Sequence, residues 1–405
     1  MKKMKLVMVG NGMAGVRTLE DLLKIAPDLY EITVFGAEPH PNYNRILLSP
    51  VLAGEQTLDE IVLNPLAWYA EHGITLHLGR TVVAIDRTRR IVRADDGTEA
   101  EYDRLLLATG SKPFILPVPG ADLAGVVAYR DIADTEAMID AAAKYRHAVV
   151  IGGGLLGLEA ANGLMLRGMD VTVVHLMPWL MERQLDDVAA NLLRDSLEKR
   201  GLKFRIGAQT EALLGGADGR VQAVRFKDGS QTPADLVVMA AGIRPNTELA
   251  QKIGLHVDRG IVVSDTMQTV TDPRIYAVGE CAAHRGIAYG LVAPLFEQGK
   301  VLATHLAEFG IGRYTGSLTS TKLKVTGIDL FSAGNFTGGD DTEEIVMSDP
   351  SGGVYKKLVI KDDKLVGACL YGDTVDGSWY FKLLREGRTV HDIRDKLMFG
   401  ESNMG

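Results

Sequence analysis

The feature that most constrains the fold is a glycine-rich turn that occurs twice, each time directly after a short apolar segment. The first copy follows residues 6–9 and places Gly10, Gly12 and Gly15 in the spacing G-x-G-x-x-G. In such a turn the first glycine permits a tight bend, the second lets the backbone approach a pyrophosphate, and the third lets a helix pack against the strand. One such turn alone is a weak indication, because glycine-rich turns also arise by chance.

The second copy makes chance a poor explanation. Residues 148–151 form another apolar segment, and helical periodicity follows the turn through residues 158–167. The residues of this second turn that we expect at a nucleotide are Gly152, Gly154, Leu156 and Gly157. Because the N-terminus of each following helix favours anions, each copy predicts one site for nucleotide phosphates. The predicted fold class is therefore α/β, with two Rossmann-like dinucleotide-binding domains.

Three further apolar segments, at residues 105–107, 236–239 and 275–278, read as buried strands that end in small residues. The residues after these strands that we expect near a bound nucleotide are Ala108, Thr109, Gly110, Gly242, Gly279 and Glu280. Glu38 lies slightly beyond the strand predicted at 31–35, where a carboxylate accepts hydrogen bonds from a ribose. A solvated turn residue is the alternative interpretation of Glu38.

After residue 310 the pattern changes. Alternating segments at 320–333, 342–348 and 354–371 predict strands, and two amphipathic helices are expected near 376–386 and 389–398. This end of the chain is therefore expected to form a third, α+β domain.

Composition excludes several classes of protein. A formal net charge of −8 argues against a nucleic-acid-binding protein, and no apolar run approaches the length of a membrane span. The two cysteines, Cys281 and Cys369, exclude a disulfide framework, a C-x-x-C pair and any cluster bound wholly by cysteines of this chain. We expect a cytoplasmic protein.

The landmarks together resemble those of two-dinucleotide-binding flavoprotein reductases of the glutathione-reductase superfamily. A narrower likeness, to the flavoprotein portion of assimilatory NAD(P)H nitrite reductase large subunits and to stand-alone flavoprotein subunits of assimilatory nitrate reductases, rests on five stretches. These are residues 39–49, 180–186, 291–294, 320–324 and 394–400. The resemblance implies an FAD-binding domain from residues 1–113 and 243–312, an NAD(P)H-binding domain at 114–242, and a C-terminal α+β interface domain at 313–405.

By this resemblance, Gly12, Ala14 and Arg45 hold the phosphates and flavin of FAD, and Glu38 and Val82 lie near its adenosine end. Arg130 matches an arginine that contacts FAD in related ferredoxin reductases. Glu280 is expected at the ribityl chain. Val292 and the start of its helix are expected at the flavin, where the helix dipole favours negative charge.

Two positions depart from the related ferredoxin reductases. Pro50 stands where those relatives carry a lysine that pairs with the glutamate matching Glu159, so Glu159 is either a helix-terminal carboxylate or a residue of the nicotinamide site. His175 stands where a site that prefers NADH often has an acidic residue. A neutral His175 can form a hydrogen bond with a ribose, whereas a cationic His175, or Arg183, can attract a 2′-phosphate. NADH is therefore the favoured substrate, and NADPH is the alternative.

The function that the resemblance implies is hydride transfer from NAD(P)H to FAD, followed by release of single electrons to an iron–sulfur, molybdenum or sirohaem acceptor protein or subunit. With two cysteines the chain is not expected to reduce nitrite by itself. The alternatives are a rubredoxin or ferredoxin reductase of another redox chain, and an NAD(H)-sensing flavoprotein with a binding role. A homodimer is compatible with the sequence.

The C-terminal domain is expected to dock the acceptor. Residues 379–381 are aromatic, and Lys382, Arg385 and Arg388 follow on the same predicted helix. The alternative is that the aromatic side chains pack the core of this domain and the cations face solvent.

Overall fold

The described part of the chain, residues 3–325 and 327–403 of a computed structural model, separates into two units that each contain a parallel sheet. Unit 1 comprises Met1–Leu48, Gln56–Lys112 and Ile243–Ser317. Unit 2 comprises Ser49–Glu55, Pro113–Gly242 and Leu318–Gly405. The segment Ser49–Glu55 therefore groups with unit 2, although in sequence it lies between two segments of unit 1.

The sheet of unit 1 has the strand order β19-β7-β1-β2-β3. Its strands are β1 (Met4–Val9), β2 (Tyr30–Gly36), β3 (Thr75–Leu78), β7 (Arg104–Leu107) and β19 (Ile275–Ala277), all paired in parallel. The last four residues of β1 and all of β19 are buried. Strands covered on both faces read as continuous apolar runs, which is why these segments were recognisable in the sequence.

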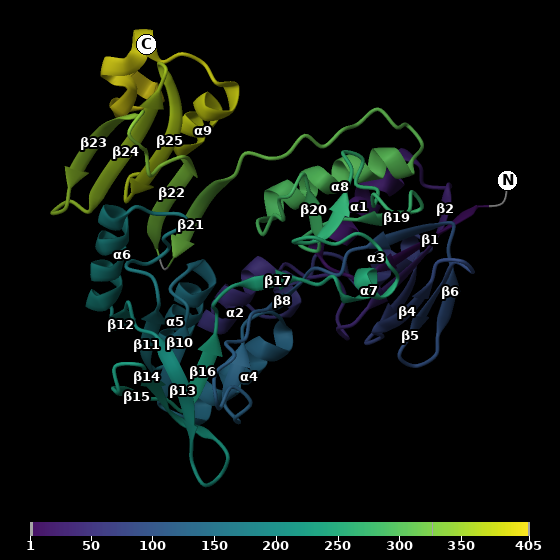
Figure 1. Ribbon diagram of the computed structural model, residues 1–405, viewed down its shortest axis with the longest axis horizontal. Helices are drawn as coiled ribbons and strands as arrows, with labels where there is room; N and C mark the ends of the chain where they lie inside the picture. Colours follow the sequence, from purple (N-terminus) through teal and green to yellow (C-terminus); the bar gives the residue numbers. More distant parts are fainter. Residues whose placement is uncertain (1–2, 326, 404–405) are drawn as a thin grey trace. The chain divides into compact units, whose positions relative to one another are not determined.

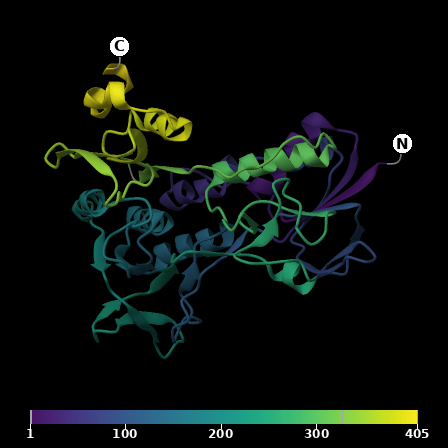
Figure 2. The ribbon, with the colours of Figure 1, turned by 45° about the horizontal axis from the view of Figure 1, so that its top comes forward.

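Helices α1 (Met13–Ile25) and α8 (Val292–Leu306) lie side by side in unit 1 (Figure 1; Figure 2). Gly299 permits this close approach, since a Cβ atom there would lie 2.8 Å from Thr18 Oγ1. The smaller elements of unit 1 are an antiparallel meander of β4 (Val82–Asp86), β5 (Ile91–Ala94) and β6 (Glu99–Glu101), together with α3 (Leu66–Glu71), α7 (Glu248–Lys252), β18 (Ile261–Val263) and β20 (Ala282–His284). A short ribbon pairs β8 (Ser111–Pro113) with β17 (Ile243–Pro245).

Unit 2 contains a second parallel sheet, with the strand order β12-β11-β10-β16-β9. The strands are β9 (Val126–Ala128), β10 (His147–Ile151), β11 (Asp170–His175), β12 (Lys203–Ile206) and β16 (Leu236–Met239). The helices are α2 (Leu48–Ala53), α4 (Ile132–Lys144), α5 (Leu155–Leu166) and α6 (Asp187–Lys199). The first residue of α2, Leu48, is the last residue of a unit 1 segment. A separate antiparallel sheet consists of β13 (Thr210–Gly215), β14 (Val221–Phe226) and β15 (Gln231–Pro233). The predicted fold class is confirmed by these two sheets.

The C-terminal part of unit 2 is a five-stranded antiparallel sheet of order β21-β22-β25-β24-β23. Its strands are β21 (Ser320–Val325), β22 (Ile328–Gly334), β23 (Glu343–Asp349), β24 (Val354–Lys361) and β25 (Lys364–Tyr371). Helix α9 (Gly377–Glu386) packs on this sheet and buries Tyr380. The second helix expected near 389–398 is a 3-10 helix over His391–Phe399.

Two tyrosines attach the C-terminal sheet to α6, which lies next to it in unit 2 (Figure 1). Tyr355 donates a 2.6 Å hydrogen bond to Asp186, the buried residue that caps the N-terminus of α6. Tyr371 lies 2.6 Å, oxygen to oxygen, from Ser196 in the same helix. Buried polar contacts of this kind require both partners, so they hold this sheet to α6 in one defined arrangement.

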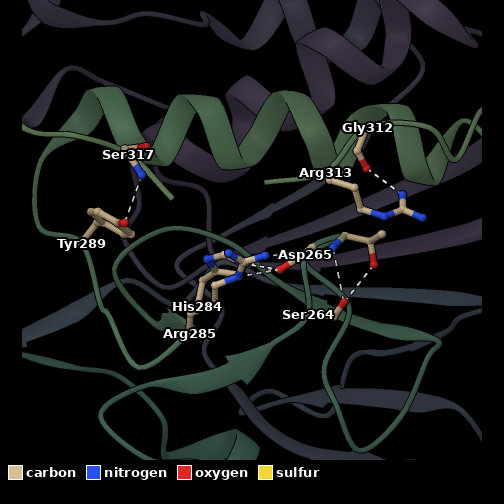
Figure 3. A network of polar contacts seen from close by, with 9 residues as sticks. Ser264, Asp265, His284, Arg285, Tyr289, Gly312, Arg313 and Ser317 are labelled. Atoms are coloured by element: carbon tan, nitrogen blue, oxygen red, sulfur yellow. Dashed lines mark hydrogen bonds and ion pairs between the residues drawn. The ribbon is translucent and has the colours of Figure 1, made fainter. Parts of the chain in front are cut away.

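The chain segment that ends unit 1 is fixed to that unit by a polar network (Figure 3). The backbone N–H of Tyr314 donates to the backbone carbonyl of Asp265, and the hydroxyl of Tyr289 accepts the N–H of Ser317. Asp265 also pairs with Arg285 at 2.7 Å and with the buried His284 at 2.8 Å. The hydrogen bonds from Arg285 and then from His284 lower the pKa of the Asp265 carboxyl to about 2. The carboxylate is therefore ionised, and able to hold these contacts, throughout the neutral pH range.

Candidate functional site

The first glycine turn has the geometry of a phosphate cradle. Gly10 has φ +105°, and a Cβ atom there would lie 2.1 Å from the carbonyl oxygen of Ala108. A Cβ atom at Gly15 would lie 2.8 Å from the side chains of both Ala108 and Met8. At Gly12, by contrast, a Cβ atom would meet no atom within 4 Å. The outer two glycines are therefore required by packing, whereas the middle one borders open space.

Helix α1 begins at Met13, directly after this turn, and its N-cap residue Gly12 provides no side-chain hydrogen bond. The N-terminal backbone N–H groups of a helix need acceptors, and a phosphate supplies them. An open cradle beside an uncapped helix fits the pyrophosphate of a dinucleotide.

The second turn repeats this arrangement in unit 2. Gly152 has φ +126° and its Cβ would lie 2.2 Å from the carbonyl oxygen of Ala240, while a Cβ at Gly157 would lie 1.9 Å from the carbonyl oxygen of Gly152. At Gly154, the N-cap of α5, a Cβ would again meet nothing within 4 Å. Leu156 is exposed in the first turn of α5. The two turns that the sequence predicted as copies are thus copies in structure.

Several other predicted residues gather at the carboxyl ends of the strands of unit 1. Ala108, Thr109 and Gly110 follow β7, and Gly279 and Glu280 follow the neighbouring strand β19. Glu280 accepts a 2.9 Å hydrogen bond from Ser111, and the N–H of Gly279 donates to Gln298 of α8 at 3.3 Å. A Cβ at Gly279 would lie 3.1 Å from Ala14 in α1. Val292 opens α8, whose N-cap has no side-chain hydrogen bond.

Glu38 and Arg45, which the resemblance assigned to different parts of FAD, form an ion pair with each other in unit 1. Glu38 also accepts a 2.7 Å hydrogen bond from Tyr43, and the Arg45 guanidinium lies 5.1 Å from the centre of the Tyr43 ring. Val82 is a buried residue at the start of β4.

The remaining predicted residues belong to unit 2. Arg130 lies between β9 and α4, and its backbone N–H donates to Asp134 at 2.7 Å. Gly242 follows the strand β16 with φ +114°.

His175 is buried at the end of β11 and has a defined tautomer. Its Nδ1 accepts the N–H of Gly153 at 3.0 Å, so the ring proton resides on Nε2, which lies 3.1 Å from the carboxylate of Glu182. Glu182 was not predicted as a site residue from the sequence, although it falls within the stretch 180–186 that carried the narrower resemblance.

Glu159 lies in the second turn of α5, beyond the residues on which a helix dipole acts most strongly. It accepts a 2.6 Å hydrogen bond from Ser49, which in turn lies 3.1 Å from the hydroxyl of Tyr129. Burial raises the pKa of the Glu159 carboxyl, and the Ser49 hydrogen bond partly opposes that rise. Ser49, the neighbour of Pro50, is therefore the partner that the sequence analysis missed.

Replacement of Glu159 by glutamine is expected to stabilise unit 2 at pH 8. Because the folded-state pKa lies above the ordinary value of 4.5, the fold favours the protonated acid, and ionisation lowers stability as pH rises through the folded-state pKa. The melting temperature of Glu159→Gln should exceed that of the wild type at pH 8, and the difference should vanish below pH 4.5. Ser49→Ala removes the hydrogen-bond donor to Glu159, so the melting temperature of this variant should fall more steeply with rising pH than that of the wild type. A Glu159→Gln protein that is less stable than the wild type at pH 8 would show that the ionised carboxylate is favoured.

The two cysteines are both buried free thiols. Burial raises the pKa of the Cys281 thiol, and burial followed by the charge of Asp186 raises the pKa of the Cys369 thiol to about 12. Thiolates are the reactive form of cysteine, so neither residue is poised as a nucleophile. Among the described residues no group of three His, Cys, Asp or Glu side chains could hold a metal ion, and none of the described helices is long and apolar enough to cross a membrane.

Comparisons with known proteins agree with this geometry. The family model of pyridine nucleotide-disulphide oxidoreductases matches residues 4–305, and that of the rubredoxin NAD+ reductase C-terminal domain matches residues 320–388. Nitrite reductase [NAD(P)H] of Bacillus subtilis is 54% identical over 97% of this chain and 48% of its own length. The assimilatory nitrate reductase electron transfer subunit of the same organism is 49% identical over 100% of this chain and 52% of its own length.

Among solved structures, a ferredoxin reductase from Rhodopseudomonas palustris superposes with a TM-score of 0.87 at 26% identity, covering 96% of each chain. The chain spans about half the length of the two Bacillus relatives. The predicted resemblance is confirmed by the family model and by these relatives. This chain belongs to the pyridine nucleotide-disulphide oxidoreductase family, and it is an oxidoreductase that uses FAD and NAD(P)H.

Proposed function

We propose that the chain passes electrons from NAD(P)H to a separate redox centre of assimilatory nitrate or nitrite reduction. The observation that carries this proposal is the state of the thiols. A disulphide reductase needs a reactive cysteine, whereas Cys281 and Cys369 are buried and their thiol pKa values are raised. We infer that the electrons leave for an acceptor outside the described part of the chain. The names of the two Bacillus relatives favour an acceptor of nitrate or nitrite reduction. The acceptor that we propose is an iron–sulfur, molybdenum or sirohaem protein or subunit, and the compartment is the cytoplasm.

We further propose that unit 1 holds FAD and that the nucleotide-binding sheet of unit 2 holds NAD(P)H. The backbone at Gly12, together with Ala14, would bind the FAD pyrophosphate, while Arg45, Glu280 and the start of α8 would position the rest of the cofactor. When bound, FAD supplies the chemistry that accepts hydride and releases electrons; the protein supplies position and electrostatics. The backbone at Gly154 would bind the pyrophosphate of NAD(P)H, and Glu159 would lie in the nicotinamide site.

Support for acceptor docking comes from a groove of about 340 Å³ on the C-terminal domain. It is lined by Ser320, Lys322, Phe331, Ser378, Phe381, Lys382 and Arg385. The four residues from α9 follow helical spacing along one face, and Lys322 is paired with Phe331 across β21 and β22. Three cations and no carboxylate line the groove, so it is complementary to an acidic protein surface.

The expected docking surface is revised by these contacts. Arg388 lies beyond α9, pairs with Glu386 at 2.9 Å and does not line the groove, whereas Lys322 does. Tyr380 belongs to the core and Trp379 packs against it, which leaves Phe381 as the aromatic residue of this helix at the groove.

Reversal of the groove charges is expected to slow electron delivery to a small acidic [2Fe–2S] ferredoxin. In the triple variant Lys322→Glu, Lys382→Glu, Arg385→Glu, the NADH-dependent reduction rate should fall about tenfold or more at low salt, and the difference should shrink as salt screens the charges. Reduction of menadione, a small neutral quinone, should be unchanged. Arg388→Glu is the matched control and should match the wild type. The docking proposal fails if Arg388→Glu is equally slow or if menadione reduction falls in parallel; it also fails if the triple variant is unaffected.

A further inference from the structure

The second glycine turn differs from the first at the residue between its first two glycines, which is Gly153 in the second turn, and the structure explains the difference. The N–H of Gly153 donates to His175 Nδ1 at 3.0 Å, and its carbonyl accepts the N–H of Met181 at 3.0 Å. A Cβ at Gly153 would lie 2.6 Å from Leu180 and 2.8 Å from the His175 ring. The loop after β11 is therefore folded onto the turn so closely that only glycine fits. In the first turn the corresponding residue is Asn11, which accepts a hydrogen bond from Tyr69.

This loop returns a carboxylate to the end of β11. Met181 adopts a left-handed conformation with φ +53°, and its side chain and that of Leu180 are buried. Glu182 follows, and one of its oxygens lies 3.1 Å from His175 Nε2. His175 thus accepts from the turn with one nitrogen and donates to Glu182 with the other, so neither ring nitrogen retains a proton for another acceptor.

We propose that Glu182, positioned by His175, selects pyridine nucleotides that lack a 2′-phosphate. This inference rests on the proposed binding of NAD(P)H at the second turn. In a βαβ nucleotide-binding unit, the adenosine ribose lies at the carboxyl end of the second strand, which here is β11. Glu182 brings there the negative charge that the sequence lacks at position 175. One carboxylate oxygen is bonded to His175, and within the described residues the other has no hydrogen-bond partner.

The carboxylate would accept a hydrogen bond from a ribose 2′-hydroxyl and repel a 2′-phosphate. The side chain of Glu182 is 26% exposed, so a ligand can reach it while part of its solvation is already removed. Arg183, the cation that could attract the 2′-phosphate of NADPH, is the exposed next residue in the same loop. The carboxylate is held by the buried imidazole, and this fixed position gives it the larger influence on the ligand.

The test compares equilibrium binding of NAD+ and NADP+ by calorimetry, with the flavin-loaded wild-type protein and two variants. Glu182→Gln keeps an acceptor for His175 but removes the charge. It should lower NAD+ affinity about tenfold, raise NADP+ affinity, and leave the melting temperature unchanged. Glu182→Lys should bind NADP+ more tightly than NAD+. Arg183→Gln, the matched control, should keep the wild-type preference for NAD+.

An unchanged ratio of NAD+ to NADP+ affinity in both Glu182 variants would overturn the inference, as would a loss of preference in Arg183→Gln alone. A bulky replacement of Gly154 distinguishes a wrong role for Glu182 from a wrong assignment of the NAD(P)H site to the second turn. If Gly154→Val abolishes NAD+ binding while the Glu182 variants keep the ratio, only the role of Glu182 is wrong. If Gly154→Val binds NAD+ normally, the assignment of the second turn is wrong.

Discussion

Replacement of Gly12 by valine is expected to yield a folded protein that has lost its flavin. A Cβ at Gly12 meets no protein atom within 4 Å, so the fold should accommodate the side chain. The added methyl groups would occupy the open space beside the N-terminus of α1 and keep a pyrophosphate from the backbone N–H groups. Losing two charge-assisted hydrogen bonds of about 1.5–2 kcal/mol each lowers affinity by roughly 100-fold or more. Absorbance of the purified variant near the flavin maxima, per mole of protein, measures the loss.

Gly10→Ala is the matched control for this variant. Its Cβ would lie 2.1 Å from the Ala108 carbonyl oxygen at φ +105°, so it should lower the stability of the protein after the flavin has been stripped. Gly12→Val should leave that stability unchanged, because it disturbs no packing. Full flavin occupancy in Gly12→Val after gel filtration would show that the first turn does not hold FAD.

Replacement of Gly154 by valine is expected to leave the protein yellow but unable to react efficiently with NADH. The open space at Gly154 matches that at Gly12, and the turn belongs to the unit 2 sheet, whose core does not include the first turn. Anaerobic stopped flow at low NADH should show flavin bleaching slowed by about 100-fold, since the lost pyrophosphate contacts are of the same kind. Flavin loss with normal bleaching kinetics would reverse the assignments of the two turns.

Features set by neighbouring residues could be predicted from the sequence. The glycine spacing at 10–15 and 152–157, and the buried strands before each turn, depend on interactions within one βαβ unit. The structure confirms both predicted strands, β1 and β10, as members of parallel sheets, and helices α1 and α5 follow the two turns. Helix α9 was also expected within one residue of its observed bounds.

Contacts between distant segments could not be predicted in the same way. Ser49 reaches Glu159 across 110 positions of sequence, and no periodicity encodes that pairing. Glu182 returns to His175 only because Met181 adopts a left-handed conformation that non-glycine residues rarely take. The 3-10 helix at His391–Phe399 shows apolar spacing that also suits an α-helix, so pattern alone did not separate the two.

The order of strands in unit 1 also determines when its sheet can be completed during translation. Strand β7 stands between β1 and β19, yet β19 begins at Ile275, and the helix packed on α1 ends only at Leu306. The strands β9 to β16 of the other parallel sheet lie within residues 126–239 and are all synthesised earlier. The parallel sheet of unit 2 can therefore be completed first. The sheet of unit 1 is still incomplete at that stage, and the edge of β7 is unpaired. Until β19 has been translated, that edge is an aggregation hazard of the nascent chain. The unit that we propose as the flavin-binding one stays incomplete until translation passes Leu306.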